Sequence, residues 1–317
     1  MELLLLAVLC LHILKTEAVV GHWCYRSQKC ELPQCEGPAQ WHQINKDCRG
    51  DKQSPVNIVT RNVVYEKSLK PLSFEGYDAK GSAQWNLENN GHTVKVALDT
   101  SPKIGGGGLE RKYKAVEFHF HWGVLSEQQI VSPGSEHSID GEKYPMELHI
   151  VHIREDASDM TEAKKTPDGL AVLAFFVKVD KEENKNYATL LSELKNIRYK
   201  GQSAKVDPLP LSSLLPPEED LERYFRYQGS LTTPDCYQGV IWTIFETPVQ
   251  LSLLQLSQFA ALHFDGKNST PMLENFRPAQ PLNGREVLWS GASVALPRAQ
   301  LLLLALALTC TLSSLSH

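Results

Sequence analysis

Two histidines separated by one residue are the first candidates for chemistry in this sequence. His119 and His121 stand in FHFHWG, alternating with Phe118, Phe120 and Trp122. Side chains alternate between the two faces of a β-strand, so both imidazoles would project from one face and the aromatic rings from the other. Two imidazoles side by side can bind one metal ion. An ordinary core strand explains the same pattern, so the metal interpretation needs a third ligand.

The segment ELHIVHI, residues 147–153, offers that third ligand. In a strand, Glu147, His149 and Val151 share one face, whereas His152 lies on the other. One histidine from this strand, beside the two of its neighbour, gives three nitrogen ligands and leaves a fourth tetrahedral position open. Catalytic zinc sites have this open position, whereas structural zinc sites are closed by four protein ligands. The two segments therefore predict a catalytic centre with Zn²⁺ as its cofactor.

These side chains must be positioned by strands, because short apolar or alternating runs bounded by Gly, Pro, Asp or Ser dominate the chain. Such runs are typical of a β-rich fold. The predicted strands span residues 92–98, 115–122, 146–153, 170–179 and 240–248. Helical patterns are few, at 186–194 and at 253–262, where Ser252 is a candidate N-cap. The polar stretch 154–168 is interpreted as a solvated surface loop with a short helix.

The middle of this 317-residue chain, residues 19–290, is long enough to form one large domain with a sizeable core. A net charge of −5 gives no indication of a nucleic-acid partner. Outside the two apolar ends of the chain there are five cysteines, Cys24, Cys30, Cys35, Cys48 and Cys236. A secreted context permits disulfides, and an odd count leaves one thiol over, but spacing alone leaves the pairing open.

Both ends of the chain resemble processing signals. Residues 1–18 have the apolar run and small-residue boundary of a secretory signal peptide, with a buried or amphipathic first helix as the alternative. Small residues at 290–292, a spacer and an apolar tail match a glycosylphosphatidylinositol (GPI) attachment signal. This predicts attachment at Ser290 and removal of residues 291–317. A tail-anchor helix, or no membrane role, is the alternative.

Several motifs together resemble the series found in the α-carbonic anhydrases. They are FHFHWG, GSEHSIDG at 134–141, ELHIVH and GSLTTPDC at 229–236, with QSPVNI, NNGHTVKV and RPAQPLNGR in support. The resemblance covers residues 36–290 and is strongest to the membrane-linked members of the family. It implies an α+β, β-dominated single domain around a large, twisted, mostly antiparallel sheet. It also implies a zinc-dependent enzyme that hydrates carbon dioxide reversibly to bicarbonate at the cell surface. Such an enzyme would be a GPI-anchored monomer, with bicarbonate transporters as candidate partners.

The same resemblance assigns roles to individual residues. His119, His121 and His149 would bind zinc, and Thr232 would orient the attacking oxygen while passing its own proton to Glu136. His92 would relay protons to solvent, although a surface turn histidine is the plain alternative. Glu147 would hold the His149 ring, with His137 in the same buried network. The substrate pocket would be lined by Val151, Val172, Leu231, Thr233, Val240 and Trp242.

Two positions depart from the pattern of many relatives. Glu117 stands where many carry glutamine, beside the first ligand. Ionised, it would raise the pH at which the site becomes active, and Lys95 could compensate by forming an ion pair with it.

By likeness to the family, Cys24 pairs with Cys35 and Cys48 with Cys236, leaving Cys30 as the odd thiol. The sequon at Asn268 makes N-glycosylation an expectation.

Two other functions fit a domain of this family. A catalytically silent binding domain would have lost at least one ligand histidine, whereas all three candidates are present here together with Thr232 and Glu136. A zinc esterase would use the same site. The small apolar pocket that is expected here favours a nonpolar gas as the main substrate.

Overall fold

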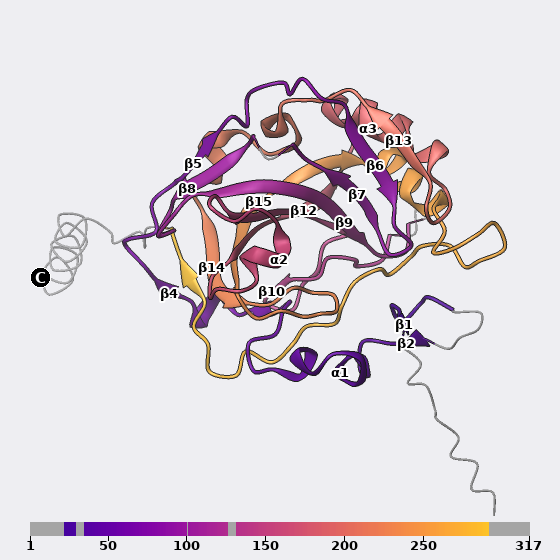
Figure 1. Cartoon of the computed structure of the whole chain (residues 1–317). Coiled ribbons are helices and arrows are strands. Elements are labelled where there is room, and N and C mark those ends of the chain that lie inside the picture. Colours follow the sequence, from indigo (N-terminus) through magenta and orange to yellow (C-terminus); the bar gives the residue numbers. More distant parts are fainter. Residues whose placement is uncertain (1–21, 30–34, 100, 126–130, 292–317) are drawn as a thin grey trace, which may run out of the picture.

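The computed structural model describes residues 22–29, 35–99, 101–125 and 131–291 (Figure 1). The predicted signal peptide, the odd thiol Cys30 and the apolar tail beyond residue 291 lie outside these residues. No helix in the described part of the chain is long and apolar enough to cross a membrane.

A mixed sheet of twelve strands forms the centre of the molecule. Ten strands follow one another in the order β13, β6, β7, β9, β11, β12, β15, β14, β16, β4, while β8 pairs with β9 and carries β5. Most neighbours are antiparallel, and β12–β15 and β16–β4 are parallel. The expected β-dominated, mostly antiparallel fold is confirmed. The larger strands are β5 (Leu72–Glu75), β6 (Trp85–Asn89), β7 (Val94–Ala97), β8 (Lys103–Gly106), β9 (Tyr113–Trp122), β11 (Met146–Arg154), β12 (Leu170–Asp180), β13 (Ser203–Val206), β14 (Tyr224–Gly229) and β15 (Val240–Ser252).

Six strands of two residues complete the set. Two of them, β4 (Val64–Tyr65) and β16 (Leu288–Trp289), belong to the edge of the large sheet. The other four form two small parallel pairs, β1 (His22–Trp23) with β2 (Cys35–Glu36), and β3 (Asn57–Ile58) with β10 (Ser138–Ile139).

The helices are short and lie around the sheet (Figure 1). The α-helices are α1 (Trp41–Ile44), α2 (Met160–Ala163), α3 (Ala188–Ser192) and α4 (Leu253–Ser257). The 3₁₀ turns are η1 (Lys46–Arg49), η2 (Thr60–Asn62), η3 (Lys185–Tyr187), η4 (Leu194–Asn196), η5 (Leu211–Leu214), η6 (Glu218–Leu221) and η7 (Gln258–Ala261). Each predicted long helix is therefore broken into shorter turns. Ser252 is the N-cap of α4 as predicted, because its hydroxyl accepts from Gln255 N while the Gln255 side chain accepts from Ser252 N.

Alternation along the central strands creates two apolar cores, one on each face of the sheet. On β12, Leu173 and Phe175 belong to the larger core, whereas Val172, Ala174 and Phe176 belong to the smaller one. Phe118 and Phe120 of β9 pack into the larger core. The histidines between them must therefore project toward the smaller core, which is where the candidate site lies.

Candidate metal centre

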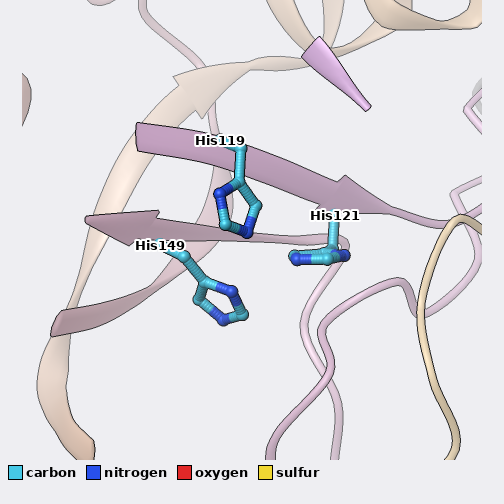
Figure 2. A group of neighbouring side chains, drawn as sticks. All are labelled: His119, His121 and His149. Atoms are coloured by element: carbon cyan, nitrogen blue, oxygen red, sulfur yellow. The ribbon is translucent and has the colours of Figure 1, made fainter. Parts of the chain in front are cut away.

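Three imidazoles from two adjacent strands converge on one face of the sheet. The antiparallel register of β9 and β11 places His119 opposite His149 and His121 opposite Glu147. One ring nitrogen from each of His119, His121 and His149 lies within 4.8 Å of the others (Figure 2). The ring centroids are 4.7–5.3 Å apart. The strand pattern in the sequence predicted this convergence.

The second nitrogen of each ring is occupied by an oxygen acceptor. His149 Nε2 donates to Glu147 Oε1 at 2.6 Å, and His121 Nδ1 donates to the carbonyl of Asn275 at 2.8 Å. His119 Nδ1 lies 3.2 Å from Glu117 Oε1. A nitrogen that donates carries the hydrogen, so the other nitrogen of a neutral ring carries the lone pair. The lone pairs therefore belong to His119 Nε2, His121 Nε2 and His149 Nδ1.

The electrostatics keep the two inner rings neutral. Burial lowers the pKa of His121 to about 3, and burial lowers that of His149 to about 4 even though Glu147 acts in the opposite direction. His121 Nε2 is buried and has no hydrogen-bond partner in the described structure. An orphaned buried lone pair is costly unless something binds it. Three imidazoles around one point, of which the two inner ones are neutral, fit Zn²⁺ with an open fourth position.

Glu147 accepts the hydrogen bonds that connect His149 to His137. Its Oε1 also accepts from His137 Nδ1 at 2.7 Å, and its Oε2 accepts from the His137 backbone N–H at 2.8 Å. Burial alone would raise the pKa of Glu147, but His137 and His149 beside it hold this pKa well below its usual value. His137 Nε2 continues the network to the Tyr227 hydroxyl, 2.7 Å away. The His149 ring is thus fixed by a fully buried carboxylate.

Glu136 lies next to the ligand nitrogens. Its Oε2 is 3.5 Å from His121 Nε2, and its Oε1 accepts from the backbone N–H of Arg277 at 2.7 Å. Burial raises the pKa of Glu136, while His149, the Arg277 N–H and the Thr232 hydroxyl lower it. Oε2 itself is buried and has no hydrogen-bond partner among the described residues. The Thr232 hydroxyl is therefore close enough to Glu136 to lower its pKa, although it makes no hydrogen bond to Oε2 among the described contacts.

A cavity of about 240 Å³ opens in front of His119 and His149. Its apolar wall includes Val151, Val172, Leu231 and Trp242, and Thr232 and Thr233 lie at its side, which brings together five of the six residues expected in the pocket. Val240 is fully buried in the smaller core instead, and it is not part of this lining.

The sequence interpretation missed three cavity residues, Pro234 beside Thr233, and Met160 and Lys164. Met160 and Lys164 belong to the stretch 154–168, which was expected to be a solvated loop with a short helix. The short helix is α2, but it covers the cavity and is not wholly solvated. The one signal in the sequence was Met160, the only large apolar residue of this segment.

Glu117 and Lys95 form an ion pair at 3.4 Å through Glu117 Oε2. Because Oε1 is already close to His119 Nδ1, the carboxylate contacts both partners at once. Burial acts to raise the pKa of Glu117, but the interactions with His119 and then with Lys95 leave the pKa below its usual value. Glu117 is therefore a charged acceptor, partly compensated by Lys95.

His92 lies under the N-terminal strand. Its ring stacks on Trp23, with centroids 3.7 Å apart and planes 14° apart, and its Nδ1 is buried without a partner in the described structure. Burial, and then the nearby His22 and Lys200, lower the pKa of His92 to about 3. In this position the ring is neutral at physiological pH.

Two disulfides join Cys24 to Cys35 and Cys48 to Cys236, the pairs implied by the resemblance. Asn268 lies exposed in a turn. Ser290 lies at the end of β16, where its backbone N–H donates to the carbonyl of Tyr224.

Comparison with known proteins places this site in a family. The model of the eukaryotic-type carbonic anhydrases matches residues 36–291. Carbonic anhydrase 4 of Rattus norvegicus is 40% identical over 319 residues, which is 99% of each chain. Carbonic anhydrase 15 of Mus musculus is 41% identical over 84% of this chain and 82% of its own, and carbonic anhydrase 12 of Homo sapiens is 37% identical over 82% and 72%. The chain belongs to the eukaryotic-type carbonic anhydrase family.

Proposed function

We propose that this carbonic anhydrase hydrates carbon dioxide reversibly to bicarbonate and a proton, with zinc as its cofactor, at the extracellular face of the plasma membrane. The observation that carries the proposal is the convergence of three imidazoles, one ring nitrogen of each lying within 4.8 Å of the others. Zinc held there supplies water activated for nucleophilic attack near neutral pH, the known chemistry of carbonic anhydrases.

The residues around the ligands complete the site. Glu147, Glu117 and the Asn275 carbonyl fix the tautomers of the three rings, so that each presents a lone pair. Thr232 has a hydroxyl that can accept one hydrogen bond and donate another, and it would donate to the Glu136 carboxylate while it accepts from the attacking oxygen and so orients it. Val151, Val172 and Trp242 would hold a nonpolar gas and exclude competing water.

Each turnover must also export a proton, and His92 is the candidate relay. A ring stacked under Trp23 with a pKa of about 3 cannot hold that proton at neutral pH. The relay therefore requires the ring to leave the stack and reach water, where its pKa returns toward about 6.5.

The enzymatic proposal is tested by stopped-flow hydration of carbon dioxide with the zinc-loaded chain. Hydration should disappear with a chelator and return with added zinc. His119→Asn should abolish both zinc retention and hydration, whereas His42→Asn on α1, away from the cavity lining, should affect neither. Full zinc occupancy without hydration would favour a silent binding domain, and ester hydrolysis in the absence of hydration would favour a zinc esterase.

The membrane location rests on the two ends of the sequence and on the disulfides, which suit an oxidising compartment. Attachment of a GPI anchor at Ser290 predicts release of the enzyme from intact cells by a phosphatidylinositol-specific phospholipase. Retention on the cells after this treatment would contradict the anchor.

A further inference from the structure

An ion pair that the proposed hydration mechanism does not use lies at the outer end of the cavity. Lys164 Nζ is 3.0 Å from both carboxylate oxygens of Asp235. Lys164 follows α2, while Asp235 follows Thr232 by three residues. The Lys164 side chain is 24% exposed and that of Asp235 40%, whereas His149 at the inner end is 1% exposed. The pair is thus nearer to solvent than His149 is.

Both halves of this ion pair are held in place. The Lys164 backbone N–H donates to the carbonyl of Met160, and α2 is capped by Asp159, which accepts from Glu162 N. The Tyr237 hydroxyl donates to the carbonyl of Thr166 at 2.6 Å and joins the same two segments a second time. The Lys164 ammonium is therefore held between the segment that follows α2 and the segment that contains Asp235. It is more restricted than the ammonium of an unpaired surface lysine.

The orientation of the pair matters for the potential inside the cavity. Lys164 lines the cavity, whereas Asp235 is not part of the described lining and is the more exposed partner. The positive end of the pair therefore faces inward. Of the second ion pair, Glu117 lines the cavity and Lys95 does not, so that pair presents its negative end beside His119. Apolar walls screen such charges less than water does.

The two pairs together distinguish a neutral substrate from an anionic product. Carbon dioxide carries no charge, whereas bicarbonate is repelled by Glu117 near the ligands and attracted by Lys164 farther out. A lysine has three N–H donors, and two are directed at Asp235, which leaves one for an anion. Thr233, two residues before Asp235, lines the same cavity and adds a hydroxyl.

We propose that Lys164, with Thr233, forms an anion subsite at the outer end of the cavity that receives the bicarbonate product on its way to solvent. The inference rests on the proposed hydration activity and identifies a residue that sets the affinity for its anionic ligand. The subsite binds a small oxyanion through one charged donor and one hydroxyl. No bond is made or broken there.

The test measures product inhibition of carbon dioxide hydration by bicarbonate at fixed pH. Lys164→Met should raise the bicarbonate inhibition constant about three- to tenfold, the range expected for loss of one partly screened charge. Asp235→Asn should lower it, because the ammonium loses its competing partner. Both effects should shrink as salt is added. Lys165→Met is the matched control, since it removes the same charge from an exposed neighbour outside the cavity lining, and it should leave the constant unchanged.

A second readout does not depend on turnover. Bicarbonate should raise the melting temperature of the zinc-loaded wild type and Lys165→Met proteins more than that of Lys164→Met. Equal inhibition constants and equal melting shifts in Lys164→Met and Lys165→Met would overturn the subsite. Absence of hydration in the zinc-loaded wild type would instead overturn the proposed function, and the melting shifts would still decide whether Lys164 binds the anion.

Discussion

Trp23 covers His92 as a stacked ring, with the two centroids 3.7 Å apart. The residue after β1 anchors this strand, because Cys24 forms a disulfide with Cys35 and its carbonyl accepts a hydrogen bond from the Trp41 indole N–H. His22, on the same strand, places a second imidazole 5.9 Å from His92. The N-terminal strand thus controls whether the candidate relay can be protonated.

Replacing Trp23 by alanine should return the pKa of His92 from about 3 toward its ordinary value near 6.5. The direction follows from burial, which penalises the charged ring and is relieved when the indole is removed. Titration of the His92 ring by NMR measures the change, with His92→Gln used to assign the signal. The explanation fails when the Trp23→Ala protein still shows no titration of this ring above pH 4.

The sequence predicted the part of the site that obeys strand alternation. His119 and His121 share a face because they are two residues apart on β9, and His149 alone of its pair faces them from β11. Strand alternation does not predict contacts between segments that are far apart in the sequence. Lys164 reaches the cavity because of a short helix after β11, and Trp23 reaches His92 from 69 positions away in the chain. No local pattern encodes either contact.

The Glu117 carboxylate, shared between His119 and Lys95, should set the pH dependence of hydration. Its pKa lies below its usual value, so it is ionised at neutral pH, and its charge opposes the build-up of further negative charge in the cavity. Glu117→Gln should therefore move the midpoint of the pH–rate profile down by about one pH unit. Lys95→Met should move it up, because the compensating cation is lost. An unchanged or higher midpoint in Glu117→Gln would reject this role.

Glu147 should control zinc affinity through the His149 ring. Glu147→Gln keeps the shape of the side chain but removes the charge that accepts from His149 Nε2 at 2.6 Å and from His137. Loss of such an outer partner typically weakens metal binding about 10–100-fold. Competition with a chromophoric chelator measures zinc dissociation directly. Glu142→Gln, at an exposed position outside the ligand network, is the control, and equal affinities in the two variants would show that Glu147 is not an orienting residue.

The two disulfides should contribute unequally to stability. Cys48 and Cys236 are 188 residues apart in the chain, whereas Cys24 and Cys35 are 11 apart. Closing the longer loop restricts the unfolded chain more, and loop entropy predicts a difference of about 2.5 kcal/mol. Removing the longer bridge also loosens contacts that the Cys48 and Cys236 carbonyls make with Arg277 and Gln53. Urea unfolding of the Cys48→Ser/Cys236→Ser and Cys24→Ser/Cys35→Ser proteins measures both losses of unfolding free energy. A larger loss from the shorter bridge would show that local packing of the N-terminal strand, and not chain entropy, decides the ranking.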